Sequence, residues 1–172
     1  MAAMASVLVN WVFPGLLVVA AMTDLTSRRI PNWIPAAMLA GFALVALAGS
    51  MGPMAAAAAL GAGLIAFAIG FALFAIGQVG GGDVKLIATT LPWYGWTMGA
   101  YDFVLGFTIA GAALTLLFLV QRLSIVQLAL VSNPYSARFA GRVKGGREIP
   151  YGVAIAAGGI LTHGAVAALH LG

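Results

Sequence analysis

The sequence predicts an all-α integral membrane protein, a single domain over residues 1–172 with about six transmembrane helices. Two observations carry this prediction. Of the 172 residues, 63% are hydrophobic and 7% are charged, whereas about a quarter of a soluble domain is charged. So little charge cannot cover a surface that faces water. The apolar residues also form runs of the length that a helix needs to cross the hydrocarbon core, which is about 20 residues.

Five apolar runs have the length of a membrane span, and a sixth, residues 84–98, is weaker because Pro92 and Gly95 interrupt it. The five stronger runs are 6–23, 33–49, 54–77, 103–120 and 151–171. We expect the first run to be a retained helix and not a cleaved signal peptide, because no basic segment precedes it and further apolar runs follow. Glycines spread through the later runs predict close packing between helices.

The cations predict the orientation of the chain. An N-terminus outside the membrane and six crossings place residues 24–32, 78–83 with the start of the next helix, and 121–150 on one side. All eight lysines and arginines then lie on that side: Arg28, Arg29, Lys85, Arg122, Arg138, Arg142, Lys144 and Arg147. By the positive-inside rule this side is the cytoplasm. Both chain termini are then expected outside.

The aromatic residues Trp93, Tyr94 and Trp96 have two interpretations. They fit an interfacial belt at the outer membrane surface, and they equally fit packing in the protein core. In the belt interpretation, the ten residues from Asp83 to Trp93 rise only about 15 Å against a hydrocarbon core of about 30 Å. Asp83 would then lie below the headgroups, where a carboxylate is a functional candidate by default.

The composition excludes several kinds of site. The chain has no cysteine, which excludes disulfides, thiol nucleophiles and cysteine-based metal centres. His163 and His170 are too few for a metal site and are predicted to be polar groups near a helix end. The small excess of cations is explained by membrane orientation and not by nucleic-acid binding. We therefore expect no metal, no cofactor and no nucleic-acid partner, and we expect contact with the lipid bilayer.

Asp24 and Asp83 are the candidate catalytic residues. Each alone has a structural explanation, because Asp24 could pair with Arg28 and Asp83 could cap the helix that follows it. Together they are predicted to lie at the same membrane level, at the cytoplasmic ends of two different helices. Two carboxyls that approach closely in a poorly solvated place share one proton. Such a pair can activate water against a carbonyl group.

The helix ends predict which carboxyl carries the charge. Asp83 is expected at a helix N-terminus, where the dipole favours the anion. Asp24 is expected at a helix C-terminus, where the dipole favours protonation. The glycine run 80–82 is predicted to use positive φ and to leave room for a substrate backbone.

Three segments resemble the motifs of prepilin peptidases. Residues 24–32, Asp-Leu-Thr-Ser-Arg-Arg-Ile-Pro-Asn, resemble the family's first-aspartate motif. Residues 80–86, Gly-Gly-Gly-Asp-Val-Lys-Leu, resemble its Gly-x-Gly-Asp signature, and residues 149–154, Ile-Pro-Tyr-Gly-Val-Ala, resemble its closing segment. The segments occur in the family's order and on one predicted membrane side. The resemblance extends from about residue 24 to residue 159.

The resemblance implies an intramembrane aspartic endopeptidase of about six helices in the bacterial inner (cytoplasmic) membrane, with Asp24 and Asp83 facing the cytoplasm. The implied substrate is a type IV prepilin or pseudopilin of the Flp type. Its short basic leader is typically cut after a glycine, just before the apolar helix, and pilus assembly machinery is a further candidate partner. The chain is similar to the short form of tight-adherence (Tad) systems and lacks the paired cysteines of bifunctional members, so we expect no N-methyltransferase activity.

The resemblance also implies supporting residues around the pair. Lys85 either orients the substrate, tunes Asp83 or anchors the cytoplasmic side. Pro31 and Asn32 are expected to shape the start of the second helix, and Tyr151 and Gly152 to line a substrate groove. The full supporting set is Gly80, Gly82, Lys85, Pro31, Asn32, Pro150, Tyr151 and Gly152.

The basic segment 121–149 is expected to be mobile near anionic headgroups, with an interfacial helix at 123–131. Two other functions fit the composition. A small ion or proton transporter would place its acids near the bilayer midplane, which the predicted position at one face disfavours. A noncatalytic subunit of a pilus or secretion assembly would not need the acid pair.

Overall fold

The computed structural model describes residues 2–122 and 149–171, and every regular element in these ranges is helical. The predicted fold class, an all-α protein with several membrane-crossing helices, is confirmed. The predictions for a mobile basic segment and for an interfacial helix at 123–131 lie outside the described residues.

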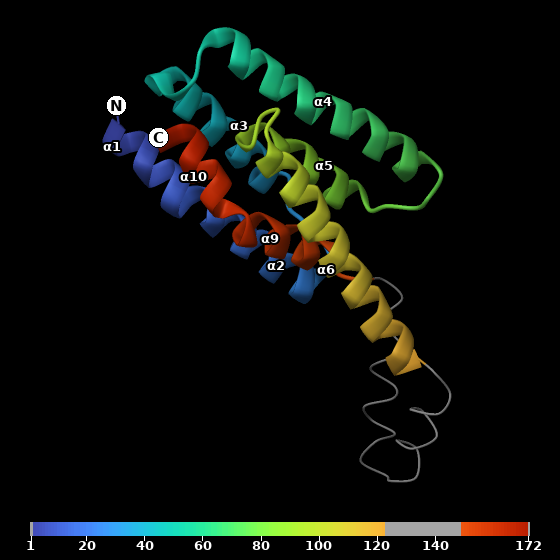
Figure 1. Cartoon of the computed structure of the whole chain (residues 1–172). Coiled ribbons are helices and arrows are strands. Elements are labelled where there is room, and N and C mark those ends of the chain that lie inside the picture. The colour runs from blue at the N-terminus through green and yellow to red at the C-terminus, as the bar shows by residue number, and fades with distance from the viewer. Residues whose placement is uncertain (1, 123–148, 172) are drawn as a thin grey trace.

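Within residues 2–122 and 149–171, four helices are long and apolar enough to cross a membrane: Ala3–Ser27, Trp33–Ser50, Pro53–Ala75 and Met98–Val120. In Figure 1 they correspond to α1 (Ala2–Val7) with α2 (Phe13–Ser27), α3 (Trp33–Val45) with a π-helical turn, α4 (Pro53–Ala75) and α6 (Met98–Arg122). The pair α9 (Tyr151–Leu161) and α10 (His163–Leu171), bent by 49°, forms a fifth if it crosses as one span. The five stronger apolar runs of the sequence are therefore helices.

The sixth predicted span is much shorter than the others. Helix α5 (Gly81–Thr90) has 10 residues and continues into a 3₁₀ turn, Leu91–Trp93. Its α-helical part rises about 15 Å, half of the hydrocarbon thickness. Pro92 stops it because proline has no N–H for the helical hydrogen bond, and Gly95 turns the chain with a φ of 58°. The described residues therefore hold up to five helices of span length and not six.

The short helix nevertheless brings the chain back to the end of the bundle where α4 begins and α10 ends. The Trp93 carbonyl is 2.9 Å from Nε2 of His170, near the end of α10. Trp96 donates its indole N–H to the Ala58 carbonyl near the start of α4 at 2.7 Å. Because α1 also packs on α10, the first and the last helix lie together at this end (Figure 1).

Close glycine contacts hold the helices together, as the sequence predicted. A Cβ on Gly158 would lie 2.6 Å from the Phe107 nitrogen, and one on Gly159 would lie 2.5 Å from a Leu17 methyl. Gly158 therefore lets α9 approach the backbone of α6, and Gly159 leaves the space that the Leu17 side chain of α2 occupies. Gly63 makes the corresponding contact between α4 and α5, where a Cβ would lie 2.5 Å from the Ala88 carbonyl oxygen.

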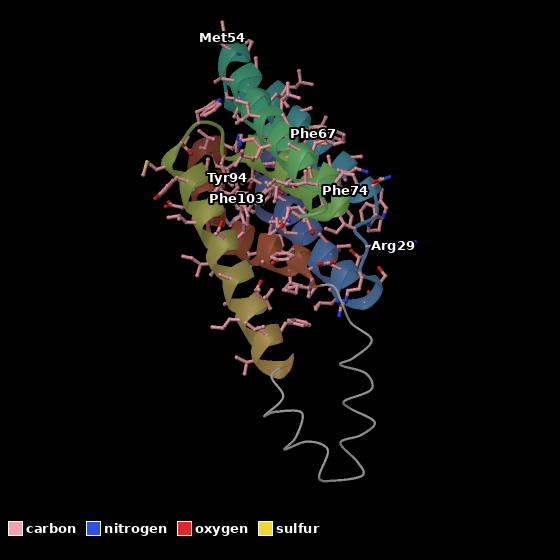
Figure 2. All side chains as sticks on the ribbon, turned by 90° about the vertical axis from the view of Figure 1, so that its right-hand side faces the viewer. Arg29, Met54, Phe67, Phe74, Tyr94 and Phe103 are labelled. Atoms are coloured by element: carbon pink, nitrogen blue, oxygen red, sulfur yellow. The ribbon has the colours of Figure 1, made fainter. Side chains whose placement is uncertain are left out.

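Two of the three clustered aromatic residues belong to the core. Trp93 and Tyr94 are 0% and 1% exposed, whereas Trp96 is 67% exposed. Tyr94 stacks on Phe103 with ring centroids 5.0 Å apart (Figure 2). The belt interpretation is therefore wrong for Trp93 and Tyr94, and the depth estimate counted from Trp93 to Asp83 loses its reference point. The 10 residues of α5, against 23 in α4 and 25 in α6, instead favour a position of Asp83 inward of the ends of its longer neighbours.

The two histidines connect helices at the end of the bundle near α10. Besides its contact with Trp93, the His170 ring places Nδ1 3.1 Å from the Ser50 hydroxyl. Nε2 of His163 lies 2.9 Å from the Val9 carbonyl oxygen. They are polar groups satisfied by neighbouring helices, as predicted from their position near a helix end.

Candidate active site

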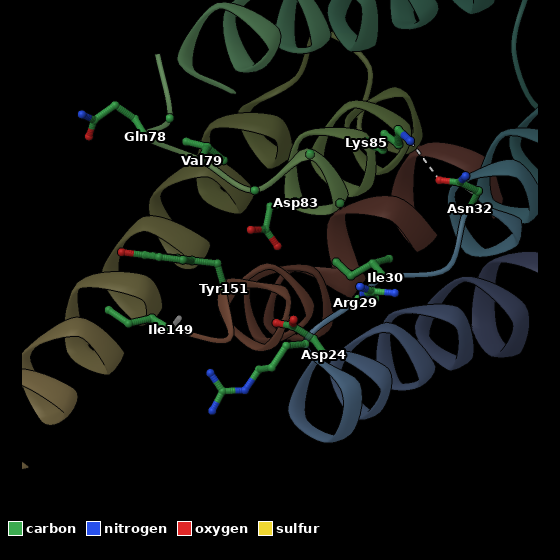
Figure 3. A pocket seen from close by; sticks show the side chains of 15 residues that line it. Asp24, Arg29, Ile30, Asn32, Gln78, Val79, Asp83, Lys85, Ile149 and Tyr151 are labelled. Atoms are coloured by element: carbon green, nitrogen blue, oxygen red, sulfur yellow. Dashed lines mark hydrogen bonds between the residues drawn. The ribbon is translucent and has the colours of Figure 1, made fainter. Parts of the chain in front are cut away.

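The ends of three helices meet at the opposite end of the bundle from the paired α1 and α10. Asp24 lies in the last turn of α2, Asp83 in the first turn of α5, and Gly152 in the first turn of α9. With the loops beside them, Asp24 and Asp83 line a cavity of about 720 Å³ (Figure 3). This volume lies within the range of roughly 300–1,000 Å³ for ligand-binding pockets.

Asp24 is held by the N-terminus of α9. Its side chain is buried, and Oδ2 accepts a hydrogen bond of 2.7 Å from the Gly152 N–H. The first N–H groups of a helix have no partner within it and carry partial positive charge. A donor of this kind favours an ionised carboxylate. The hydrogen bond from Gly152 and the N-terminus of α9 therefore favour the ionised form of Asp24.

The absence of a side chain at Gly152 makes this contact possible. A Cβ there would lie 2.8 Å from Asp24 Oδ2 and 3.0 Å from its Cγ. Any larger residue at this position would displace the carboxylate. The supporting role that the resemblance implied for Gly152 thus has a physical basis, although the contact is with Asp24 and Gly152 does not line the cavity.

Asp83 points into the cavity and does not cap its helix. The N-cap of α5 is Gly80, and the helix has no side-chain cap hydrogen bond. The Asp83 carboxyl folds over Gly80, where a Cβ would lie 2.8 Å from Oδ2, and it faces Asp24 across the cavity in Figure 3. The structural explanation of Asp83 as an N-cap is therefore wrong.

The protonation of the pair is the reverse of the one predicted from the helix ends. Burial, with the charge of Asp24 as the second cause, raises the pKa of Asp83 from 3.8 to about 7. Asp83 lies outside the span-length helices. The prediction failed because it counted only the helices that carry the two aspartates, whereas the N-terminus of a third helix, α9, stabilises the Asp24 anion. Below about pH 7 Asp83 is therefore mostly a carboxylic acid, beside an Asp24 carboxyl that accepts a hydrogen bond from the N-terminus of α9.

The glycine run 80–82 supports the pair because its missing side chains leave room for close packing, and not because it adopts positive φ. Gly80 has an extended conformation with φ of −71°, and Gly81 and Gly82 begin α5. A Cβ on Gly82 would lie 3.2 Å from Ile30 Cβ, so the missing side chain lets α5 approach the segment that follows Asp24. The positive φ prediction for this run is wrong; in this loop it is Gly77 that takes a φ of 74°.

Lys85 and Asn32 connect the first two sequence motifs. The Lys85 ammonium donates a hydrogen bond of 2.9 Å to Asn32 Oδ1 and points away from Asp83 in Figure 3. Asn32 is the N-cap of α3, and the Pro31 carbonyl accepts the Ile34 N–H at 3.1 Å. Pro31 and Asn32 therefore shape the start of α3, and Lys85 ties α5 to it.

The third motif contributes both a wall and a helix start. Tyr151 lines the cavity, and its hydroxyl lies 2.9 Å from the Thr115 hydroxyl of α6. Pro150 is buried and is the N-cap of α9.

Sequence reasoning did not single out several other residues that line the cavity. These are Arg28, Arg29, Ile30, Gln78, Val79 and Ile149. Arg28, Arg29, Ile30 and Ile149 lie within the motif segments 24–32 and 149–154, and Gln78 and Val79 directly precede the segment 80–86. Arg28 also ends α2 in a left-handed conformation, with φ of 54°.

The comparison with known families agrees with the geometry. The model of the type IV leader peptidase family matches residues 11–121. The match contains the segments of Asp24 and Asp83 and ends before the segment 149–154. No curated protein and no solved structure matches the chain. Because the family match covers more than half of the sequence, the chain belongs to the type IV leader peptidase family.

Proposed function

We propose that the protein is an aspartic endopeptidase in which Asp24 and Asp83 activate a water molecule. The observation that carries this proposal is the convergence of two carboxyls from separate motifs in one cavity, under conditions that favour opposite protonation states. The family match supports a peptidase. The pair supplies both a base and an acid, so the reaction needs no covalent intermediate.

In the proposed reaction, the Asp24 carboxylate accepts a proton from water while the water oxygen attacks the scissile carbonyl carbon. The Asp83 carboxylic acid gives its proton to the carbonyl oxygen, which yields a neutral gem-diol. Collapse of this intermediate returns a proton to Asp83, breaks the C–N bond and transfers the proton held by Asp24 to the leaving nitrogen. The products are a leader ending in a carboxyl group and a protein with a new amino terminus.

We further propose a type IV prepilin or pseudopilin of the Flp type as the substrate. The described cavity is lined by the cations Arg28, Arg29 and Lys85, and its acidic lining residues are the two aspartates themselves. A basic leader therefore finds no separate acidic partner there, which favours selection by shape and backbone access at the cut. A small residue such as glycine at the end of the leader meets this requirement.

The direct test uses the purified protein in detergent with a prepilin carrying its leader. A single cut at the leader boundary, identified by mass spectrometry, is the expected result. An intact precursor, or cuts at many positions, would refute the proposed function. The same reaction run with a methyl donor should leave the new amino terminus unmethylated.

Cleavage should decline as the pH rises through about 7. Asp83 must be protonated to donate to the carbonyl oxygen, and its pKa is raised to about 7. Above this value each pH unit lowers the protonated fraction by about tenfold. The measurement is kcat/KM between pH 5 and 9, with protein integrity checked at each pH. A profile that is flat from pH 6 to 9 would contradict the role of Asp83 as the acid.

Lys85→Met and Asn32→Ala should each lower kcat/KM by about fivefold, because each removes a hydrogen bond worth about 1 kcal/mol. The double variant should be no worse than either single one if the two side chains act only through each other. A Lys85→Met loss far larger than that of Asn32→Ala would instead indicate that Lys85 acts on the substrate or on Asp83.

The active site is proposed to face the cytoplasm. Arg28, Arg29 and Lys85 surround it, and the positive-inside rule places such residues in the cytoplasm. Reporter fusions after Arg29 and at Arg142 should therefore report a cytoplasmic location, and fusions at either chain end should report the outside. A periplasmic signal at Arg142 would overturn the proposed orientation and the side of the active site with it.

A further inference from the structure

A second, apolar groove opens beside Asp83. Its volume is about 440 Å³, and it lies between α4 and α6, with residues of α5 and α9 at its base. It shares Gln78, Val79, Asp83 and Tyr151 with the catalytic cavity. Every other residue that lines it is apolar: Ala66, Ile69, Gly70, Leu73, Val84, Ile87, Leu91, Val104, Phe107 and Ile155. The two cavities therefore meet at Asp83 and differ sharply in polarity.

The groove has a closed base and open walls. Val84 and Ile155 at its base are almost fully buried. A Cβ on Gly70 would lie 2.7 Å from a Val84 methyl, so α4 and α5 are in close contact there. On the walls, Leu73 of α4 and Val104 of α6 are 40% and 39% exposed. Apolar side chains from another molecule can therefore pack between these walls.

We infer that this groove binds the first apolar residues that follow the cleavage site of the precursor. The inference rests on the proposed function and adds a binding site to it. A bound substrate chain that runs from the catalytic cavity into the groove first lies near three cations. It then passes Asp83 and enters the apolar groove. This order of polarity matches a precursor with a polar leader, a scissile bond and an apolar segment. Binding would hold the bond against the carboxyl pair.

A similar groove on the other side of α5 lacks this connection. It has a volume of about 390 Å³ and is lined by Leu39 of α3, Leu64 of α4 and further apolar residues. Of the residues that line the catalytic cavity, it shares Lys85 and neither aspartate. A segment bound there would not be led to the carboxyl pair. This second groove therefore provides a matched control on the same helix, α4.

The first experiment narrows each groove with a bulky side chain. Leu73→Trp and Val104→Trp are compared with Leu64→Trp in the detergent-purified enzyme. The substrates are a full precursor and a peptide cut short just after the scissile bond. The wild type should cut the full precursor with at least tenfold higher kcat/KM. Leu73→Trp and Val104→Trp should lower kcat/KM for the full precursor to the wild-type value for the short peptide. They should change kcat/KM for the short peptide by less than twofold. Leu64→Trp should change kcat/KM for neither substrate.

The second experiment uses the absence of cysteine from the chain. In an inactive Asp83→Asn background and with copper–phenanthroline added as the thiol oxidant, Val104→Cys should form a disulfide with a cysteine placed in the first apolar residues of the precursor, and Leu64→Cys should not. Equal cross-linking at both positions would overturn the groove assignment.

The outcomes separate the groove from the proposed function. A wild-type enzyme that cuts the short peptide as well as the full precursor would overturn the groove assignment. So would unchanged cleavage by Leu73→Trp and Val104→Trp, the result expected if a lipid chain fills the groove. An equal loss on both substrates would also overturn it, because the effect would then reach the carboxyl pair. A wild-type enzyme that cuts neither substrate would refute the proposed function itself.

Discussion

Asp24→Asn and Asp83→Asn should each lower kcat/KM for precursor cleavage by about 10³-fold. Asparagine has nearly the same shape as aspartate but can neither accept nor donate the proton that moves in the reaction. General acid–base catalysis contributes roughly 10²–10⁴-fold, and each change removes one of the two partners. The measurement is initial cleavage rate with detergent-purified protein and a full-length precursor.

Asp102→Asn is the matched control for these variants. Asp102 is an exposed acid on α6 and does not line the cavity. This variant should cleave at the wild-type rate, and all three proteins should keep the wild-type helical circular dichroism and elution volume. More than a tenth of wild-type activity in Asp24→Asn or Asp83→Asn would contradict the assignment of the pair.

Gly152→Ala should lower kcat/KM by at least about 10²-fold without unfolding the protein. The added Cβ would lie 2.8 Å from Asp24 Oδ2, so the carboxylate must move and lose its 2.7 Å hydrogen bond. Misplacement of a catalytic group by about 1 Å can cost about 10²-fold in rate. The backbone N–H is retained in alanine, so the loss would report the lack of space and not the lack of a donor.

Gly164→Ala provides the comparison for this prediction. It adds the same methyl group in α10, where nothing lies within 4 Å of the new Cβ. Both substitutions increase helix propensity, so a general effect of removing glycine from a helix should appear in both. Wild-type activity in Gly152→Ala would show that Asp24 does not depend on this contact.

The fold was predictable from sequence to the extent that it depends on local composition. An apolar run of span length must satisfy its backbone hydrogen bonds within itself in lipid, so its helical state follows from the run. The span count was less predictable. Pro92 and Gly95 marked the weak segment, but how far α5 extends depends on the core contacts that bury Trp93 and Tyr94. Periodicity alone could not distinguish a buried aromatic residue from an interfacial one.

The site shows the same division. The convergence of Asp24 and Asp83 followed from the arrangement of crossings, because alternating spans bring their ends to common sides. The protonation of the pair could not be predicted, because it depends on the N-terminus of α9. The residue of α9 that bonds Asp24 is Gly152, which is 128 residues away in the sequence. The partner of Lys85 was also unpredictable, because the Lys85–Asn32 bond joins helices that the sequence cannot orient relative to each other.

The shortness of α5 has a consequence for how water reaches a reaction inside a membrane protein. Helix α5 has 10 residues, whereas α4 and α6 have 23 and 25, so the helices of the bundle differ in length by more than a factor of two. The long helices have a length that matches the bilayer, whereas α5 rises only about half of the hydrocarbon thickness, so we expect water to enter beside α5 through the catalytic cavity. Hydrolysis would then require no opening of the membrane, because water would reach the scissile bond through the cavity of the protein.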